Sequence, residues 1–540
     1  MSAGRLLRLF APLFFIAVVS CSDRAPDRAA AAKTGKPAYG DAIVVGSIGE
    51  PSTLIPLLAS DSASHEVSGL VYNALVRYDK NLRLEGELAQ AWDVSKDGLT
   101  ITFHLRRGVK WHDDHEFTSR DVLYTYQVTI NPKTPTAYAE SFKQVKSAET
   151  PDPYTFRVTY AKPYAPALES WMTSILPAHL LEGKEITASK LSRRPIGTGS
   201  YRFKEWVPGQ KIVLESNKDY FEGRPYIDRY VYRIIPDNST MFMELKASGL
   251  DMMNLSPVQF RRETDTPRFS DRYNKYRYPA FAYTYMGYNL RNPLFSDKRV
   301  RQAITSAINK EEIIHGVLLG LGQKAHGPYK PGTWAYNPNI KDFDYNPARA
   351  VRLLAEAGWR EKNRDGILVK NGRPFQFTIL TNQGNDQRLK TAQIIQQRLR
   401  HVGIDVKIRV IEWASFLNQF IDKGDFEAVI LGWTIGQDPD LYDVRHSSKT
   451  GPKELNFIGF KNHEVDRCLE EGRSTFDVEK RRKCYFRIQE IFADEQPYTF
   501  LYVPDALPVV SARFHGIEPA PAGISYNFIR WYVPKDEQLH

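Results

Sequence analysis

Three short apolar runs between residues 375 and 431 decide the class of fold: Phe375–Leu380 (FQFTIL), Ile404–Ile411 (IDVKIRVI) and Phe426–Leu431 (FEAVIL). Each run is short, apolar and bounded by polar residues, which predicts a strand. Between the first two runs, apolar residues repeat at helical spacing: Leu389, Ala392, Ile395, Leu399 and Val402. Gly403 is a natural helix stop, and a second helix is expected near residues 414–421. Strands that alternate with helices predict a parallel sheet with helices on its faces, and hence an α/β fold.

The front half of the chain is predicted to be mostly β. Residues 41–47 form a candidate first strand, and residues 99–105 (LTITFHL) alternate strictly between apolar and polar, as a half-buried strand does. Residues 200–216 and 226–235 are also strand-like. Lys96-Asp97-Gly98 suits a hairpin turn, because glycine tolerates a positive φ without a clash at Cβ.

Towards the end of the chain, residues 465–473 and 478–492 predict an antiparallel helix pair, followed by a strand over 498–503. Cys468 and Cys484 lie at similar distances from the turn between these helices. Facing positions would allow a disulfide, although either cysteine could simply be buried. The bridge is our prediction.

The first 22 residues predict export. Arg5 and Arg8 precede an unbroken apolar run over 9–19, which is too short to span a bilayer and has the length of a signal-peptide core. Val18-Val19-Ser20-Cys21 then resembles the bacterial lipobox, in which Cys21 is acylated and becomes the mature N-terminus. The alternative is an ordinary signal peptide with an incidental cysteine. Residues 22–39 read as a flexible tether that holds a globular body clear of the membrane.

Composition and motifs argue against several classes of function. The 540 residues carry a formal charge of +10, but the basic residues are spread out and form no block typical of nucleic-acid binding. Signatures of zinc proteases, serine hydrolases and P-loop enzymes are absent. The run 111–115 (WHDDH) contains potential metal ligands, but adjacent residues in a turn rarely converge on one ion. We therefore expect a polar turn there, with no metal, no cofactor and no nucleic-acid partner.

An ordered series of blocks resembles the family 5 extracellular solute-binding proteins, the dipeptide and oligopeptide receptors of ABC importers. The signature begins at Leu88-Ala89-Gln90-Ala91-Trp92 and continues through residues 103–113 and 117–122. The further blocks are residues 197–201, 206–209, 217–225, 288–289, 297–310, 355–359, 432–440 and 446–448. The resemblance covers essentially all of the chain beyond the export signal.

The resemblance implies a two-lobed, type II-like periplasmic-binding-protein fold with an extra inserted domain. One lobe then combines residues 40–62, 194–277 and 505–540, the inserted domain is 63–193, and the second lobe is 278–504. Residues 1–21 are the expected signal and lipobox. Closure of the two lobes on a ligand would account for function without covalent chemistry.

The loop after the third strand, Trp433 to Asp440, is the main binding candidate, because ligands of doubly wound sheets lie beyond the carboxyl ends of strands. The residues expected to contribute are Trp433, Thr434, Gly436, Asp438 and Asp440. Asp438 or Asp440 could pair with a ligand ammonium group, or Asp438-Pro439-Asp440 could be only a helix-starting turn. Relatives carry an aspartate in a Trp-x-x-Asp pattern, where this chain has Gly436.

Four further ligand-binding candidates come from other segments: Glu50, Ser52, Tyr285 and Asn289. Arg445 stands where many relatives have an aromatic residue, and we expect a surface position for it in preference to contact with a ligand carboxylate or phosphate.

The function implied is a monomeric, lipid-anchored periplasmic or cell-surface receptor that delivers a peptide or similar solute to an ABC permease in the inner membrane. The alternatives are a receptor for a nickel complex, haem or a sugar, a signalling receptor, and an exported hydrolase.

Overall fold

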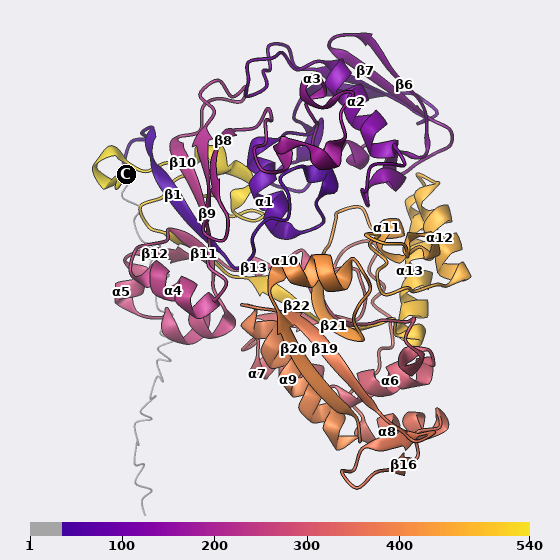
Figure 1. The fold of residues 1–540 in the computed structure, drawn as a ribbon. Coiled ribbons are helices and arrows are strands. Elements are labelled where there is room, and N and C mark those ends of the chain that lie inside the picture. Colours follow the sequence, from indigo (N-terminus) through magenta and orange to yellow (C-terminus); the bar gives the residue numbers. More distant parts are fainter. Residues whose placement is uncertain (1–34) are drawn as a thin grey trace, which may run out of the picture.

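The structure is a computed structural model that describes residues 35–540. Two large sheets and one smaller sheet organise the chain (Figure 1). The predicted signal and the lipobox cysteine Cys21 lie outside the described residues. Within the described part, no helix has the length and apolar character that a membrane span requires.

The first large sheet gathers strands from both ends of the chain. Its order is β12-β23-β11-β1-β10-β9-β8. The strands are β1 (Gly40–Ser47), β8 (Tyr201–Val207), β9 (Lys211–Ser216), β10 (Ile227–Ile234), β11 (Met252–Asn254), β12 (Tyr273–Lys275) and β23 (Pro508–Ser511). β1 pairs in parallel with β10 and β11, while the other neighbours are antiparallel. The strands predicted over 41–47, 200–216 and 226–235 are confirmed.

The second large sheet is mixed and has the order β13-β22-β14-β21-β19-β20, with β15 added beside β22. Its strands are β13 (Tyr278–Pro279), β14 (Ala282–Tyr288), β15 (Gly322–Lys324), β19 (Gln376–Asn382), β20 (Asp405–Ile411), β21 (Ala428–Thr434) and β22 (Tyr498–Ala506). β19 is parallel to β20 and to β21, which confirms the parallel set predicted from 375–431. β14 then pairs antiparallel with β21 and β22.

Helices cover both faces of the second sheet, and each face has its own apolar core. They are α6 (Lys298–Ala307), α7 (Lys310–Gly316), α8 (Pro347–Glu356), α9 (Asp386–His401), α10 (Trp413–Ser415), α11 (Tyr442–Arg445), α12 (His463–Arg473) and α13 (Val478–Glu495). A π-helix over 416–421 continues α10. Small strands β16 (Glu361–Lys362), β17 (Leu368–Lys370) and β18 (Arg373–Pro374) form a separate ribbon. Gly403, at φ +88°, follows α9 as predicted.

A four-stranded antiparallel sheet, β4-β5-β7-β6, forms the third body. Its strands are β4 (Ala89–Val94), β5 (Thr100–Leu105), β6 (Val145–Asp152) and β7 (Thr155–Tyr160), with the β2 (Val76–Tyr78) and β3 (Leu84–Gly86) hairpin beside them. Its helices are α1 (Ser62–Val71), α2 (Ser119–Ile130) and α3 (Ala178–Leu181). Gly98, at φ +72°, lies in the β4–β5 turn, so the hairpin prediction is confirmed.

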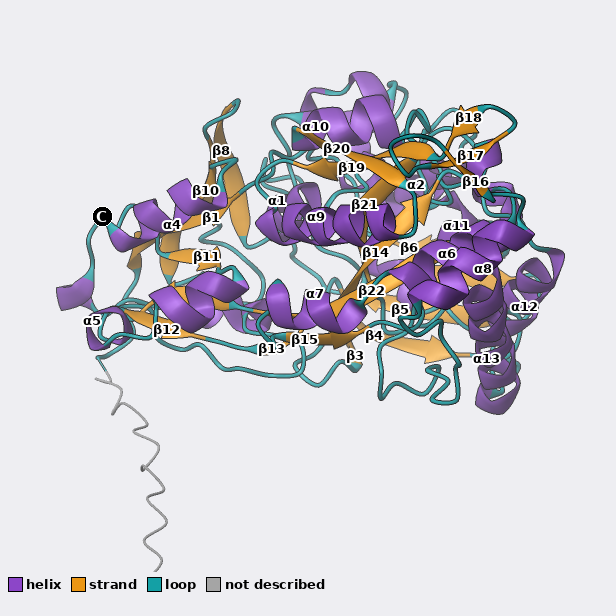
Figure 2. Cartoon of the chain, turned by 90° about the horizontal axis from the view of Figure 1, so that it is seen from below, coloured by secondary structure: helices purple, strands orange, loops and turns teal. Residues whose placement is uncertain are grey.

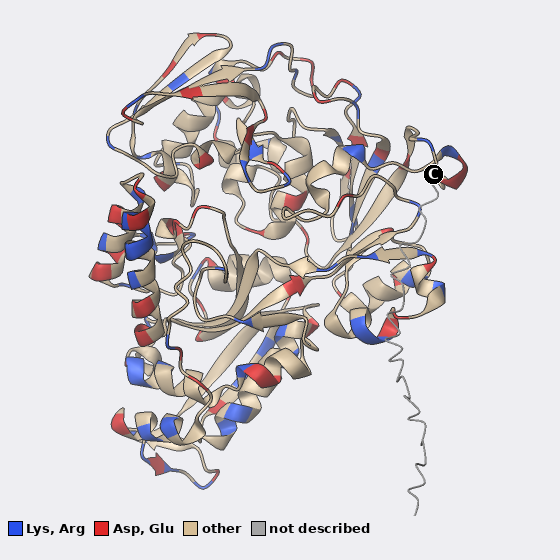
Figure 3. Cartoon of the chain, turned by 180° about the vertical axis from the view of Figure 1, so that it is seen from behind, with Lys and Arg blue, Asp and Glu red and all other residues tan. Residues whose placement is uncertain are grey.

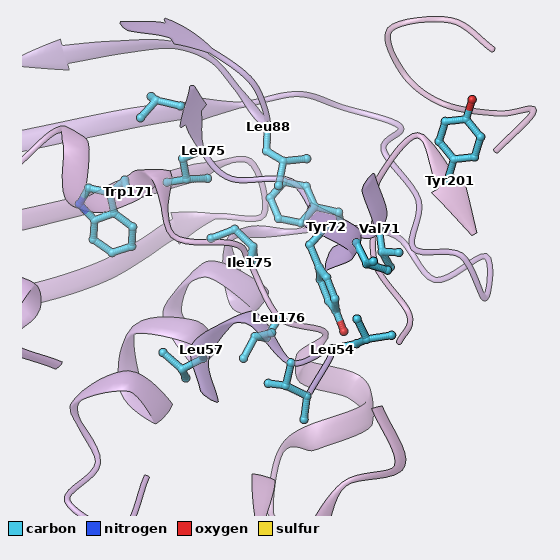
Figure 4. Packing of buried hydrophobic residues seen from close by; sticks show 14 of the residues in the cluster. Leu54, Leu57, Val71, Tyr72, Leu75, Leu88, Trp171, Ile175, Leu176 and Tyr201 are labelled. Carbon is cyan, nitrogen blue, oxygen red and sulfur yellow. The ribbon is translucent and has the colours of Figure 1, made fainter. Parts of the chain in front are cut away.

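One continuous apolar core joins this third body to the first sheet. Figure 4 shows Leu54, Tyr72 and Leu176 packed together, and the same cluster includes Trp171 and Tyr201. Helices α4 (Asn238–Lys246) and α5 (Pro267–Ser270) cover the other face of the first sheet through a smaller core. The two large sheets therefore belong to two bodies that lie side by side (Figure 2).

The division into domains at the residue boundaries given above stays a prediction. The strands of each sheet fall within the predicted segments with one exception: β22 runs to Ala506, two residues beyond the boundary at 504.

Candidate functional site

The two large sheets approach each other at two close contacts. A Cβ placed on Gly384, beyond the end of β19, would lie 2.2 Å from the carbonyl oxygen of Pro236. A Cβ on Gly49, beyond the end of β1, would lie 3.2 Å from the ring of Trp413. Segments that leave strand ends on both bodies therefore face one another, which is where a ligand held between two lobes would bind.

A cavity of about 250 Å³ lies beside the first of these contacts. One wall comes from the first sheet and α4, and the other from the residues that open α9: Ser47, Ile48, Met241, Met253, Asn254, and residues 384–387. Glu66 also lines it, and burial raises the pKa of that carboxyl. A cavity with one wall on each body fits a molecule that holds the two bodies together.

Arg388 lies on the first turn of α9, one residue beyond this cavity wall. Its Nη1 donates to the Asn382 side-chain oxygen at 2.8 Å. The hydroxyl groups of Tyr285 and Tyr502 lie near enough to interact electrostatically with its charge. Among residues 35–540, no carboxylate comes within ion-pair distance of its guanidinium. Burial lowers the pKa of Arg388, so the charge is held at a cost that an anionic ligand would offset.

Gly432 makes room for this arginine. A Cβ at Gly432 would lie 3.1 Å from Arg388 Nη2 and 3.1 Å from the Tyr283 carbonyl oxygen. The absence of a side chain on β21 therefore lets the guanidinium extend over the carboxyl ends of β19 and β21.

The predicted loop from Trp433 to Asp440 begins later than expected, because β21 includes Trp433 and Thr434. These two residues pair with Tyr283 and Ala282 on β14, so their backbones belong to the sheet. Trp433 is half-buried and donates from Nε1 to the Tyr498 hydroxyl at 3.2 Å, while Thr434 and Gly436 are exposed. β21 extends to Thr434 because β14 supplies pairing partners as far as Ala282. The apolar pattern of residues 426–431 contains no information about these partners.

Asp438 forms an ion pair inside the protein. Both of its carboxylate oxygens accept from Arg481 Nη2 on α13, at 2.7 and 2.6 Å. The Arg481 side chain is 9% exposed and that of Asp438 15%. A carboxylate that neutralises a buried arginine is not free to receive a ligand ammonium group.

Asp440 is paired in the same way with Arg473 on α12, at 2.7 Å. Its other oxygen accepts from the Tyr442 backbone at 3.1 Å. α11 begins at Tyr442 with Leu441 in the N-cap position, so neither aspartate is the helix cap. The helix-cap alternative was wrong in position. Each aspartate instead accepts from the backbone N–H two residues further on, which closes a turn, and also pairs with an arginine.

The same loop faces the third body. Glu169, in the segment before α3, lies close enough to Asp438 to hydrogen-bond its backbone. Burial, and then the Asp438 charge, raise the pKa of Glu169 to about 8. Arg473 also donates to the Tyr164 hydroxyl at 3.1 Å. The loop therefore lies at an interface between bodies.

Glu50 and Ser52 both serve local structure. Glu50 accepts from the Trp206 indole at 2.8 Å and from the Gly209 backbone at 3.1 Å. Ser52 donates to Asp61 at 2.6 Å. Their side chains hold the segment after β1 in place.

Tyr285 and Asn289 are not placed together. Tyr285 is fully buried and stacks on Tyr498 with ring centroids 3.8 Å apart. Asn289 follows the far end of β14, where its side-chain amide donates to the carbonyls of Gly424 and Phe426. Since Tyr288 pairs with Ala428 and Ala282 with Thr434, Asn289 lies at the opposite end of the strand from the loop. The ligand role of Asn289 stays a prediction, at a position remote from the loop.

The surface position favoured for Arg445 was also wrong. The side chain is fully buried, its Nη2 donates to the Tyr283 hydroxyl at 3.0 Å, and its guanidinium lies 3.9 Å above the Tyr498 ring. Aromatic faces compensate the charge, because the ring quadrupole attracts a cation.

Cys468 and Cys484 are free thiols, so the expected bridge is not formed. They lie on α12 and α13 as predicted and interact directly: a hydrogen bond from Cys484 lowers the pKa of the Cys468 thiol.

Sequence reasoning missed Arg388, whose guanidinium has no carboxylate within ion-pair distance among residues 35–540. Its signal was available: an arginine opens a helix directly after a strand whose carboxyl end was predicted to face the ligand. The distant arginines that pair with Asp438 and Asp440 carried no such signal.

Comparisons with known proteins agree with this architecture. The family described as bacterial extracellular solute-binding proteins, family 5 middle, matches residues 83–453. Oligopeptide-binding protein AppA of Bacillus subtilis is 36% identical over 531 residues and 96% of each chain. Heme-binding protein A of Haemophilus influenzae is 30% identical, over 88% of this chain and 89% of its own.

Solved structures show the same fold. The structure of AppA from Bacillus subtilis in complex with a nonapeptide has a TM-score of 0.88 at 35% identity, covering 93% of this chain and all of the other. NikZ from Campylobacter jejuni in complex with Ni(L-His) has a TM-score of 0.83 at 28% identity, covering 91% and 99%. The two-lobed α/β fold is thereby shown.

Proposed function

The chain belongs to the bacterial extracellular solute-binding proteins of family 5, and on that premise we propose that it captures a peptide between its two lobes. We call the body of the first sheet lobe I and that of the second sheet lobe II. An ABC permease in the inner membrane would receive the peptide from the closed form. The oligopeptide-binding relative, which matches nearly the whole chain, favours a peptide over other solutes.

Arg388 is the observation that carries the proposal. Its guanidinium, which lacks a carboxylate partner in residues 35–540, stands at the edge of lobe II beside a cavity whose other wall is lobe I. A peptide ends in a carboxylate, and a guanidinium can bind both oxygens of a carboxylate at once. We assign the carboxyl end of the peptide to Arg388 and the polar wall opposite to the backbone after β1.

The experiment compares two forms of one peptide by calorimetry, with a free and with an amidated C-terminus. The wild-type chain should bind the free acid about 10- to 150-fold more tightly, since a charge-assisted hydrogen bond contributes about 1.5–3 kcal/mol. Arg388→Gln should lose this preference. Arg352→Gln on α8, where the side chain is exposed, should retain it and serves as the matched control.

Equal binding of both peptide forms by the wild type would remove Arg388 as the carboxylate anchor. Mass spectrometry of the ligand released from purified protein tests the broader proposal. Recovery of haem, a nickel complex or a sugar in place of peptide would replace the peptide assignment with one of those solutes.

Attachment to the membrane through Cys21 is the second part of the proposal. The lipobox-like Val18-Val19-Ser20-Cys21 supports it. Cys21→Ser should leave the precursor unacylated and uncleaved at this site. A variant that is processed and fractionates like the wild type would show that the cysteine is incidental.

A further inference from the structure

Three potential metal ligands come together on the surface of the third body, outside the lobe interface. They are the carboxylate of Asp113 and the imidazoles of His115 and His179, and their ligand atoms all lie within 4.8 Å of one another. His179 Nε2 lies 2.8 Å from the Asp113 Oδ2. The two imidazole rings are stacked, with centroids 4.1 Å apart.

The segment that carries Asp113 and His115 is a tight, closed turn. Its ends pair through Lys110 and Glu116, and the Trp111 backbone donates to the His115 carbonyl at 2.8 Å. The Trp111 side chain is fully buried beneath the turn. Two ligands therefore project from a backbone that is anchored in the core, which lowers the entropy cost of placing them around an ion.

His179 comes from a different element, the short helix α3. The helix is fixed by a hydrogen bond from the Ala178 backbone to Asp121 at 3.0 Å and by the fully buried Leu181. Figure 1 shows α3 at the top of the molecule, on the side turned away from lobe II. The cluster is thus separate from the cavity between the lobes.

His112 is excluded from the cluster by its own contacts. Its Nε2 lies 3.0 Å from the Gly199 carbonyl, and the Gly197 backbone donates to its Nδ1. Burial lowers the pKa of His112 to about 4. The His112 side chain is therefore occupied by contacts inside the protein, while Asp113 and His115 are exposed to solvent.

We propose that Asp113, His115 and His179 form a binding site for a divalent transition metal of the zinc class. Two imidazoles and one carboxylate are ligands that Zn²⁺ takes, and three protein ligands leave a coordination position for water. Binding would replace the His179–Asp113 hydrogen bond and join the turn at 111–115 to α3. The sequence argument against a metal considered only residues 111–115, whereas the third ligand proposed here lies 64 residues beyond His115 in the chain.

Zinc titration by calorimetry tests the site, using the purified chain without a polyhistidine tag. We expect one site on the wild type, and at least a tenfold loss of affinity in His115→Ala and in His179→Ala. His104→Ala is the matched control, because His104 Nε2 also lies 2.8 Å from an aspartate, Asp93, but belongs to no three-ligand cluster of the residues that the structure describes. Its zinc affinity should equal that of the wild type.

A thermal melt gives a second readout, since a ligand that binds only the folded state raises Tm. Zinc should raise Tm in the wild type and in His104→Ala but not in the other two variants, whose metal-free Tm shows whether they fold. Equal zinc affinity in all four proteins would overturn the site, as would the absence of binding to the wild type. Peptide affinity should be the same in His179→Ala, so the site can fail while the peptide proposal stands.

Discussion

Two regions at the same edge of the lobe II sheet handle charge in opposite ways. After β21, Asp438 and Asp440 each find an arginine within 2.7 Å. After β19, the Arg388 side chain donates to an amide oxygen and, within residues 35–540, has no carboxylate partner. Ion pairs that are complete inside the protein are part of its architecture, whereas a partly buried charge without a counter-ion leaves an interaction for a ligand to complete.

Acidic and basic side chains also form ion pairs along α12 and α13, the two helices that carry Arg473 and Arg481. At the left of Figure 3, the ribbons of α12 and α13 show acidic and basic residues along their length. Examples are the pairing of Arg487 with Glu464 at 2.8 Å and of Arg467 with Glu471 at 3.8 Å. Exposed pairs of this kind contribute little to stability, so the partly buried pairs with Asp438 and Asp440 are the ones to test.

The largest effect is expected from Asp438→Ala, which leaves the Arg481 charge buried without its carboxylate partner. Breaking a buried pair costs about 3–5 kcal/mol. We expect a lower free energy of unfolding by urea denaturation, with peptide affinity nearly unchanged. The double variant Asp438→Ala/Arg481→Met is the control and should recover much of the loss. A stable Asp438→Ala protein with weakened peptide binding would reverse the comparison and restore Asp438 as a ligand anchor.

Oxidation of Cys468 and Cys484 tests how firmly α12 and α13 hold the paired loop. The thiols interact across the two helices that supply Arg473 and Arg481. A bridge that closes a loop of about 15 residues should stabilise the fold by about 3 kcal/mol in the chain-entropy model. Tm should rise after mild oxidation in the wild type and not in Cys484→Ser. Two titratable thiols remaining after oxidation would show that the side chains cannot reach bonding geometry.

The interface between the loop and the third body should make stability depend on pH. Burial and the Asp438 charge raise the pKa of Glu169 to about 8, and burial raises that of Asp443 to about 7. A carboxyl group whose pKa is higher in the folded state contributes its full stabilisation at pH values below its pKa in the unfolded chain, which is near 4.5 for glutamate. That stabilisation is lost as the pH rises through the pKa of the folded state.

We therefore expect Tm to fall between pH 5 and pH 9. Glu169 should contribute about 2 kcal/mol to the loss of unfolding free energy, which is less than its full pKa shift implies because the side chain is partly solvated. Glu169→Gln should flatten this dependence, and the part that remains includes the contributions of Asp443 and of Glu87, whose pKa burial also raises to about 7. A Tm that rises with pH over this range would contradict the protonated state assigned to Glu169.

Sequence patterns predicted the elements better than the side-chain partners. The strands around 375–431 and the helix between them follow from local periodicity, because burial on one face repeats every turn or every second residue. The partners of Asp438 and Asp440 do not, since Arg481 and Arg473 lie 43 and 33 residues further along the chain. The blocks that resemble the family predicted the fold correctly. They favoured the loop after Trp433 as the binding site and did not indicate Arg388 at the start of α9.

The smallest effect, and the sharpest test of the comparison, comes from two glycines four residues apart. Gly432→Ala would place a Cβ 3.1 Å from Arg388 Nη2, so the guanidinium must shift by a few tenths of an ångström. Gly436→Ala, in the paired loop, would meet only the Asp438 carbonyl oxygen, at 3.5 Å. An off-rotamer side chain costs about 0.5–1.5 kcal/mol, which predicts peptide binding weakened about 2- to 12-fold in Gly432→Ala. Gly436→Ala should bind as the wild type does. If calorimetry shows the reverse order, the ligand contacts the exposed loop, and the unpaired arginine is not its anchor.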